Sequence, residues 1–255
     1  MSALTLHARP SKDFDSRLAE TCALLGEVVA RYPRASGDKS PAVVQASSLG
    51  AEDMVITHLL ETLQLDAGIF VLQTGLLHPE TNHVLDRLLA TSRLPVNVYH
   101  PHADALVQFV AREGDQAMYK SIALRKACCG IRKMEPLRRA LAGKKAWITG
   151  LRREQSGARA EVPHRDHTDP AITKINPLAA WSWGDVWHYI ALHQVAYNPL
   201  HDQFYPSIGC APCTRAISLG EDFRAGRWWW EDEAAKECGL HVAAAAPTLP
   251  AKETA

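Results

Sequence analysis

Apolar residues in the first half of the chain follow two alternating spacings. Within residues 13–32 they recur every three or four positions, which predicts an amphipathic helix with Cys22 on its apolar stripe. Short apolar runs, of the length typical of buried strands, follow at 42–46, 69–73, 96–99 and 146–149. Helical patterns separate these runs at 51–63, about 80–90, 103–113 and 117–127. Strands spaced by helices predict an α/β fold, a Rossmann-like open and mostly parallel sheet flanked by helices.

The pattern loosens after residue 150. Glycine, proline and charged residues are frequent between 154 and 180, which predicts long loops. A helix is expected at 183–193, with Ser182 as its N-cap, and a loop-rich segment at 198–213. Residues 242–255 are mostly Ala, Pro and Thr, a composition typical of a disordered chain end.

Composition narrows the class of protein. The 255 residues, 47% of them hydrophobic, suffice for one full-sized α/β domain and exclude a disordered chain. No apolar run approaches the roughly 18 residues of a membrane helix, and the N-terminus lacks the apolar stretch of a secretory signal. A cytoplasmic protein without membrane contact is therefore expected. The balance of 28 Lys+Arg against 28 Asp+Glu argues against bulk nucleic-acid binding.

The balanced total hides a local excess of positive charge. Between Lys120 and Arg153 the chain carries eleven basic residues and one acidic residue, Glu135. Such a block is either a solvated face or a positive basin for an anionic small molecule.

Two loops after predicted strands have the composition of anion-binding sites. Residues 47–53, Ser-Ser-Leu-Gly-Ala-Glu-Asp, offer small residues, hydroxyl groups and the N–H groups of a helix N-terminus. Residues 149–153, Thr-Gly-Leu-Arg-Arg, follow the fourth strand, and Arg159 comes soon after. Ligands of open parallel sheets lie at these strand ends, and arginine donates paired hydrogen bonds to phosphate or sulfate. An ordinary turn and solvated arginines are the alternative interpretations.

Cysteine provides the most unusual signal. A disulfide framework does not fit a chain without a secretory signal, so metal binding or thiol chemistry is expected. Cys128-Cys129 and the Cys-x-x-Cys motif at 210–213 could together surround one metal centre. Spacing alone leaves an iron–sulfur cluster and zinc both open, with a redox disulfide as a third possibility. Cys238 lies outside this set in a polar, Gly-flanked segment with His241 close by, and is either a reactive thiol or a surface cysteine.

Seven motifs occur in a familiar order between about residues 42 and 241. They are Ser47–Asp53, Thr74-Gly75 with His78–Thr81, Cys128–Lys133, Thr149–Ser156, Cys210–Arg215, Arg227–Glu231 and Lys236–His241. In this combination the chain resembles the assimilatory adenylylsulfate reductases, the iron–sulfur branch of the (phospho)adenylylsulfate reductase family.

The resemblance implies a reductase that converts adenylylsulfate into sulfite and AMP, with thioredoxin as the dithiol donor, in sulfate assimilation toward cysteine. Cys238 would be the catalytic nucleophile, forming an S-sulfocysteine on the enzyme while AMP leaves. The ligands of one [4Fe–4S] cluster per subunit would be Cys128, Cys129, Cys210 and Cys213. The cluster would act as a structural and electrostatic element, because two-electron thiol–disulfide chemistry already accounts for the reduction.

The resemblance also assigns substrate-binding residues. The loop at 47–53 would cradle the phosphosulfate, Lys133 would lie between cluster and substrate, and arginines with His241 would bind the anionic end. The complete set is Ser47, Ser48, Gly50, Asp53, Thr74, Gly75, Lys133, Arg152, Arg159, Arg224, Arg227 and His241. Two motifs depart from the family pattern. Gln73 stands where Asp is common, and residues 155–159 read Gln-Ser-Gly-Ala-Arg instead of Gln-Ser-Pro-x-Arg.

The resemblance further divides the chain into three parts. Residues 1–220 would form a nucleotide-binding and iron–sulfur domain of the adenine nucleotide alpha-hydrolase type. Residues 221–241 would form a mobile C-terminal catalytic segment, followed by the tail at 242–255. This segment would shield the thiosulfonate and then present it to thioredoxin. A homo-oligomer is expected, with neither nucleic acid nor membrane as a partner.

Three other functions compete with this interpretation. A phosphoadenylylsulfate reductase, or an enzyme of dual specificity, would use the same fold, but reductases of that kind lack the two cysteine pairs. An ATP-pyrophosphatase-type RNA thiolase requires a Ser-Gly-Gly-x-Asp-Ser loop, which this sequence lacks. A non-enzymatic Cys₄ zinc module would leave Cys238 and the anion-binding loop without a role.

Overall fold

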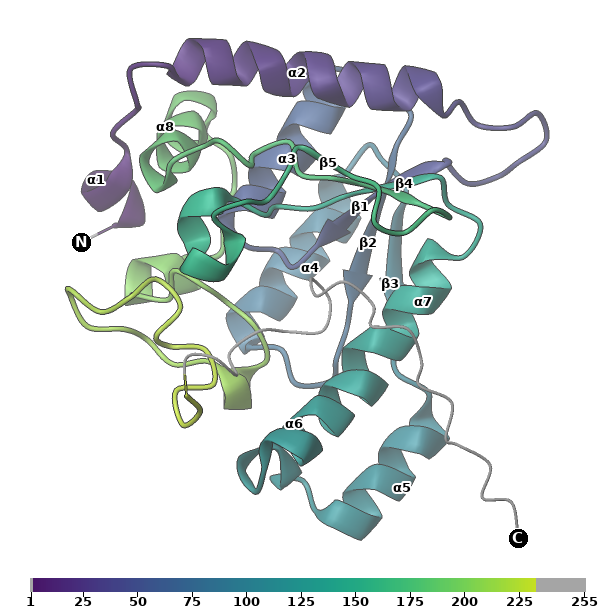
Figure 1. Cartoon of the computed structure of the whole chain (residues 1–255), viewed down its shortest axis with the longest axis vertical. Helices are drawn as coiled ribbons and strands as arrows, with labels where there is room; N and C mark the ends of the chain where they lie inside the picture. Colours follow the sequence, from purple (N-terminus) through teal and green to yellow (C-terminus); the bar gives the residue numbers. More distant parts are fainter. Residues whose placement is uncertain (1, 233–255) are drawn as a thin grey trace, which may run out of the picture.

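Within residues 2–232, the part of the chain that this computed structural model describes, six strands form one sheet (Figure 1). Their order is β3-β2-β1-β4-β6-β5. The strands are β1 (Val43–Ser47), β2 (Gly68–Leu72), β3 (Val96–Tyr99), β4 (Ala146–Ile148), β5 (Arg165–Asp166) and β6 (Thr173–Ile175). Neighbouring strands pair in parallel except for β5 and β6, which are antiparallel. The predicted open, mostly parallel sheet is confirmed.

The predicted helices are present close to their expected bounds. They are α2 (Phe14–Arg31), α3 (Ala51–Thr62), α4 (Pro79–Thr91), α5 (Ala103–Glu113) and α8 (Trp183–His193). The predicted N-cap of α8 is confirmed, because the Ser182 side chain accepts a hydrogen bond from Asp185 N. A short α1 (Ala3–His7) precedes α2 and was not expected from the sequence.

Both faces of the sheet are covered, as Figure 1 shows. Val43, Ile69 and Ile148 belong to a large core that includes residues of α2, α3, α4 and α8. The residues next to them in the strands, Val44 and Phe70 among them, pack instead against α7. Successive strand side chains point to opposite faces, so the continuous apolar runs in the sequence reflect burial on both sides.

One long helical stretch replaces the short helix predicted at 117–127. A 3₁₀ turn η1 (Ala117–Tyr119) is followed by α6 (Ile122–Cys129), a π-helical turn η2 (Gly130–Met134) and α7 (Glu135–Leu141). The π turn begins directly after Cys129 and contains Lys133. Such turns are rare and occur often at functional sites, because they change the direction of the side chains that follow.

The segment at 154–180 is only partly the loop that the sequence predicts. It contains β5 and β6 together with the 3₁₀ turns η3 (Arg153–Gln155) and η4 (Gly157–Arg159). The prediction of loops was wrong for the two strands, because runs of two and three residues are too short to show an alternating pattern.

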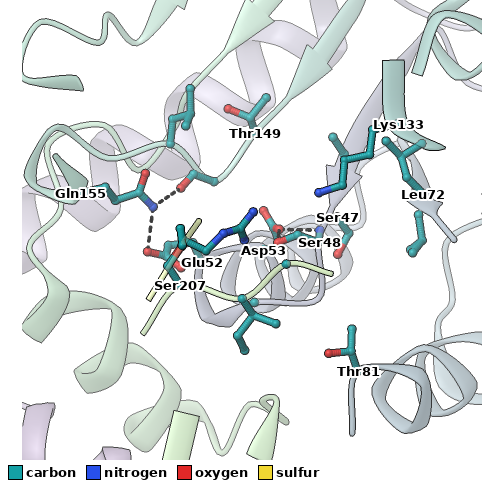
Figure 2. A pocket seen from close by; sticks show the side chains of 18 of the residues that line it. Ser47, Ser48, Glu52, Asp53, Leu72, Thr81, Lys133, Thr149, Gln155 and Ser207 are labelled. Carbon is teal, nitrogen blue, oxygen red and sulfur yellow. Dashed lines mark hydrogen bonds between the residues drawn. The ribbon is translucent and has the colours of Figure 1, made fainter. Parts of the chain in front are cut away.

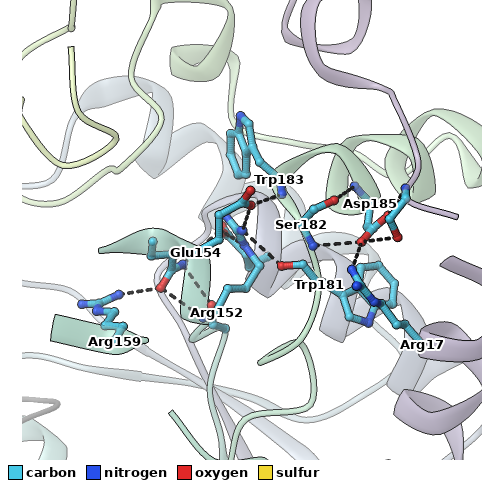
Figure 3. A network of polar contacts seen from close by, with 12 residues as sticks. Arg17, Arg152, Glu154, Arg159, Trp181, Ser182, Trp183 and Asp185 are labelled. Carbon is cyan, nitrogen blue, oxygen red and sulfur yellow. Dashed lines mark hydrogen bonds and ion pairs between the residues drawn. The ribbon is translucent and has the colours of Figure 1, made fainter. Parts of the chain in front are cut away.

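A buried carboxylate joins the N-terminal segment to α8, and Figure 3 shows its contacts. Asp185 accepts hydrogen bonds from Ser11 N at 2.7 Å and Ser182 N at 2.8 Å, and it pairs with Arg17 at 3.0 Å. Burial acts to raise the pKa of Asp185, but hydrogen bonds from Ser11 and Ser182 outweigh it, so the pKa lies below its ordinary value. The ionised carboxylate is therefore the form that stabilises this junction.

None of the helices in the described part of the chain is both long enough and apolar enough to cross a membrane.

Replacing Asp185 should test this junction. Asp185→Ala removes a buried carboxylate that accepts from several partly buried donors, so we expect the free energy of unfolding to fall by about 3 kcal/mol in urea denaturation. Asp15→Ala, on the exposed side of α2, is the matched control and should change it by less than about 0.5 kcal/mol. Equal effects of the two substitutions would contradict the assigned role of Asp185.

Candidate active site

A cavity of about 210 Å³ lies where β1, β2 and β4 end. Ser47, Leu72 and Thr149, at the ends of these strands, all line it (Figure 2). Further walls come from the first turn of α3, from the π turn and from residues 206–209 and 223–228. The strand order reverses between β1 and β4, and such a switch point is where open α/β sheets bind ligands.

The loop between β1 and α3 is shaped by its own side chains. Ser48 donates two hydrogen bonds to Asp53 Oδ2, from its backbone N and from Oγ, each of 2.6 Å. Leu49 adopts a positive φ of 64°, and its N–H donates to Ser47 Oγ at 3.2 Å. Four residues predicted to bind the substrate line the cavity: Ser47, Ser48, Gly50 and Asp53. The Ser48 hydroxyl proton is directed to Asp53.

Asp53 is a buried carboxyl group beside the cavity. Burial raises its pKa to about 6, although the hydrogen bonds from Ser48 act in the opposite direction. Gly150, in the loop after β4, provides the space for it, because a β-carbon at residue 150 would lie 2.6 Å from Asp53 Oδ1. The loops after β1 and β4 therefore fit together only with glycine at this position.

A chain of polar contacts joins the same two loops; Figure 2 shows Gln155 beside Glu52, and Figure 3 shows Arg152 beside Glu154. Arg152 Nε donates to Glu52 Oε1 at 2.9 Å, and Gln155 Nε2 donates to the same oxygen at 3.0 Å. Arg152 also pairs with Glu154 at 2.9 Å and is completely buried. It was predicted as a substrate contact, and it is not among the residues that line the cavity.

Four cationic side chains line the cavity: Lys133, Arg159, Arg224 and Arg227. Figure 2 shows Lys133 extending its ammonium group into the cavity. The lining also contains two carboxyl groups, Glu52 and Asp53, and the first of these is paired with Arg152. The excess of positive charge favours an anionic ligand.

Arg227 depends on the small size of a neighbour. A β-carbon at Gly209 would collide with the Arg227 guanidinium, so this side chain passes directly over the glycine. The guanidinium lies 4.7 Å from the ring centre of Trp228, which is buried and also lines the cavity. Arg125 of α6 lies 4.6 Å from the same ring centre. Arg224 lies 6.0 Å from this ring centre, so three cations surround the Trp228 side chain.

A buried ion pair fixes the chain just after this tryptophan. Arg125 donates to both oxygens of Glu231, at 2.9 and 2.7 Å, and both side chains are almost completely buried. Planar guanidinium and carboxylate groups match in this two-bond geometry. The pair holds the end of the described chain against α6. Its arginine, Arg125, lies three residues before Cys128 in that helix.

Two of the four predicted cluster ligands, Cys128 and Cys129, end α6, Cys213 ends the turn η6 (Ala211–Cys213), and Cys210 is the N-cap of that turn. Cys128, Cys210 and Cys213 belong to one buried cluster of side chains, and Cys129 is half-buried. Thr74 Oγ1 lies 3.3 Å from Cys210 Sγ, and Thr74 lines the cavity. The thiols therefore adjoin the cavity.

These thiols have the chemistry of soft metal donors. Burial raises the pKa of the Cys128 thiol. It also raises the pKa of Cys213 to about 11, although the positive charges of Lys133 and Arg227 act to lower it. The five cysteines in the described part of the chain are free. Between residues 2 and 232, no three His, Cys, Asp or Glu side chains are grouped closely enough to hold a single metal ion. Buried thiols beside cationic side chains fit a thiolate-ligated group, whose negative charge those cations would offset.

The turn after β2 explains one departure from the family pattern. Gln73 Oε1 accepts from Gly75 N at 3.1 Å, and Gln73 Nε2 donates to Asn82 Oδ1 of α4 at 2.8 Å. The amide thus shapes the turn as an acceptor, without a carboxylate. Of the two residues predicted here to bind the substrate, Thr74 lines the cavity, whereas Gly75 is exposed and does not.

The chain matches the family model of the phosphoadenosine phosphosulfate reductase domain over residues 42–216. It belongs to this family. A protein of Allochromatium vinosum named adenosine 5′-phosphosulfate reductase is 52% identical over 214 residues, covering 84% of each chain. A protein of Burkholderia cepacia with the same name is 49% identical over 245 residues, covering 93% of this chain and 97% of that protein.

The fold of this phosphosulfate reductase domain is also found among solved structures. A crystal structure of phosphoadenylyl-sulfate reductase from Candida auris, in complex with phosphate, aligns with a TM-score of 0.61 at 24% identity. The alignment covers 80% of this chain and 97% of that one. This likeness confirms the predicted fold class.

Several lining residues of the reductase domain were not predicted, among them Thr81, His201, Ser207 and Trp228. His201 is buried, and burial lowers its pKa to about 4. Its Nε2 lies 3.1 Å from Ala51 N across 150 positions of sequence. No local motif indicates a contact between residues so far apart in the sequence, so sequence patterns alone could not have predicted it.

Some predicted residues lie outside the described part of the chain. They include Cys238, His241 and the tail at 242–255, and the segment predicted at 221–241 is described only as far as Asp232. Their roles, and the division into three parts, stay predictions.

The fit between the loops can be tested at Gly150. Gly150→Ala places a methyl group against Asp53 and Glu52, so we expect the free energy of unfolding to fall by roughly 1–3 kcal/mol, measured by urea denaturation. Gly157→Ala is the matched control, because a β-carbon there meets nothing within 4 Å. Unchanged stability of Gly150→Ala would show that the two loops do not pack as described.

Proposed function

We propose that this member of the phosphosulfate reductase family is an adenosine 5′-phosphosulfate (adenylylsulfate) reductase. It reduces adenylylsulfate to sulfite and AMP in sulfate assimilation. The observation that carries the proposal is the identity of 52% and 49% with proteins of that name, over 84% and 93% of the chain.

The cavity supports a nucleotide with an anionic end. Ala46, Phe70, Leu137 and Trp147 contribute apolar surface to its wall, which suits a planar base. The cationic side chains suit phosphate and sulfate groups, since arginine can donate two parallel hydrogen bonds to each. A neutral ligand would leave this positive charge uncompensated.

The predicted substrate residues divide into two roles. Ser47, Gly50, Thr74 and Lys133 line the cavity and would contact the substrate, as would Arg159, Arg224 and Arg227. Ser48, Asp53 and Arg152 would act mainly by holding the two loops in place, because their polar groups bond to each other or to Glu52.

The reaction requires a thiolate that attacks the sulfate sulfur. In the proposed sequence, Cys238 Sγ forms an S–S bond to that sulfur while the sulfur–oxygen bond to AMP breaks, leaving an S-sulfocysteine. The first thiolate of a dithiol protein such as thioredoxin then attacks Cys238 Sγ, and sulfite leaves with the electron pair. The second thiol resolves the mixed disulfide, so the dithiol is oxidised by two electrons and Cys238 is regenerated. The cavity cations would offset the negative charge that develops on AMP and sulfite.

We further propose that Cys128, Cys129, Cys210 and Cys213 hold a [4Fe–4S] cluster. Three of these thiols share one buried cluster of side chains next to Thr74, and Lys133 and Arg227 lie close enough to lower the pKa of Cys213. When bound, the cluster supplies structural support and fixed charge beside the cavity. A cytoplasmic location and a homo-oligomeric state remain predictions from the sequence.

A second candidate is the reduction of the 3′-phosphorylated substrate. The family model is named for phosphoadenosine phosphosulfate, and the Candida auris protein is named a phosphoadenylyl-sulfate reductase. The choice between the two substrates therefore has to be made by experiment.

Sulfite release tests the proposed activity. The anaerobic enzyme, with thioredoxin, its reductase and NADPH, should show a kcat/KM at least about tenfold higher for adenylylsulfate than for the 3′-phosphorylated form, a difference of about 1.4 kcal/mol. Similar values would indicate dual specificity, and the reverse preference would favour the second candidate. Absence of sulfite with both substrates would rule out the reductase activity.

A pair of cysteine variants tests the division between nucleophile and ligands. After incubation with adenylylsulfate and no reductant, mass spectrometry of the wild type should find one added SO₃ group, on the peptide containing Cys238. Cys238→Ser should lose this adduct and all turnover but keep its iron, because the four ligand thiols are intact. Cys213→Ser, the matched control, should lose iron. An adduct on another cysteine, or zinc in place of iron, would refute these assignments.

A further inference from the structure

His201 is a buried side chain to which the proposed reaction gives no role. It lies in the short helix η5 (Pro199–Gln203) and lines the cavity. Its Nε2 lies 3.1 Å from the backbone N of Ala51, the first residue of α3. A residue far along the chain thus supplies a hydrogen-bond acceptor at the start of the helix that follows the anion-binding loop.

The start of α3 has no acceptor from its own sequence. The N-cap is Gly50, which has no side chain, whereas Ser, Thr, Asp or Asn commonly cap a helix. The first hydrogen bond within the helix runs from Met54 N to Gly50 O. The N–H groups of Ala51, Glu52 and Asp53 therefore lack partners in the preceding turn, and His201 accepts from the first of them.

The position of His201 is fixed by contacts on either side of it. Asn198 donates to Thr81 Oγ1 of α4 at 2.9 Å, which ties the beginning of η5 to that helix. Asp202 accepts from Ala3 N at 2.7 Å, which ties the following residue to α1. The imidazole is thus carried by a segment that is held at two independent points.

The contact requires a neutral imidazole. Nε2 acts as the acceptor, so the proton must lie on Nδ1. The ring centres of Trp183 and Trp187 lie 5.9 and 5.3 Å from that of His201. Burial lowers the pKa of His201 to about 4, against the opposing effect of the Glu52 carboxylate. His201 therefore remains an acceptor at neutral pH.

A cap at the second or third N–H group would compete with an anionic ligand. The side chain of an ordinary N-cap residue accepts from one of these groups, which here belong to Glu52 and Asp53. Anions bind to helix N-termini through such donors. Glycine at the N-cap, combined with a histidine that reaches the first N–H group, leaves both donors to a ligand.

We propose that His201 is a positioning residue for the phosphosulfate group. By accepting the Ala51 N–H, it holds the first turn of α3 while the N–H groups of Glu52 and Asp53 stay open to the anion. This inference rests on the proposed function, because it concerns the same cavity and the same substrate.

Two substitutions separate the acceptor from the bulk of the ring. His201→Phe keeps a ring but removes the acceptor, whereas His201→Gln can place an amide oxygen near the position of Nε2. Both are made in the Cys238→Ser background, and affinities for adenylylsulfate and adenosine are measured by calorimetry. His201→Phe should weaken adenylylsulfate at least about tenfold, the size of one lost hydrogen bond, with adenosine unchanged within about twofold. His201→Gln should restore most of the adenylylsulfate affinity.

His58→Phe is the matched control, because His58 is also on α3 but bonds to Tyr189 and does not line this cavity. It should leave both affinities unchanged. Equal weakening of adenylylsulfate and adenosine by His201→Phe would indicate a general structural role, and unchanged adenylylsulfate affinity would remove any role; either result overturns the proposal. Turnover of adenylylsulfate by the wild type, measured in parallel, shows separately whether the proposed function holds.

Nitrogen NMR of the wild type provides a test that does not depend on a variant folding. The His201 signals, identified by their absence in His201→Gln or by sequential assignment, should show a neutral ring protonated on Nδ1 at pH 7. Exchange of the Ala51 amide with solvent should be slow. A charged ring, or a proton on Nε2, would contradict the proposal.

Discussion

Parallel pairing of β1 with β2 and β4 is the constraint on which the site depends. Parallel neighbours end at the same edge of a sheet, so the loops that follow these strands must meet there. Their meeting is then fixed by contacts between the loops themselves. Arg152 and Glu52, 100 positions apart in the sequence, form one of these contacts, and Asp53 beside Gly150 forms another. Without the sheet order, none of these residues would be close together.

The arginines of this protein serve two separate purposes. Arg125 and Arg152 are buried and ion-paired, so their charge is largely cancelled where it stands. Removing Glu231 would leave Arg125 as a buried cation without this partner, which costs several kcal/mol, whereas Arg152 is paired with both Glu52 and Glu154. Three other arginines line the cavity, where their guanidinium groups can contact a negatively charged ligand: Arg159, Arg224 and Arg227. Of the basic residues counted between Lys120 and Arg153, only Lys133 lines the cavity, and its three arginines lie outside that block.

The sequence predicted those parts of the fold that have a repeating pattern. The strands β1 to β4 and the helices α2, α3, α4, α5 and α8 were found because their apolar residues recur over enough positions to be recognised. The site was expected at the strand ends, because the carboxyl ends of parallel strands share one edge of the sheet. The strands β5 and β6 were not found because each is too short to show alternation.

The details of the site were harder to predict, because side-chain roles depend on contacts between distant residues. Arg152 has the residue type of a ligand contact, yet Glu52 and Glu154 occupy its guanidinium. The Ser48 hydroxyl was expected to meet an anion, and it donates to Asp53. The bond between His201 and Ala51 has no local signature at all. Motifs identified which residues gather around the cavity, but only the three-dimensional contacts separate those that face a ligand from those that support them.

The ion pair between Arg125 and Glu231 has a consequence for the synthesis of the protein. The two residues are 106 positions apart, and Arg125 leaves the ribosome long before its partner. Burying the guanidinium without Glu231 would leave a charge unpaired in an apolar environment, which is strongly unfavourable. The helix that carries Cys128 and Cys129 therefore cannot complete its packing until nearly all of the described chain has been made.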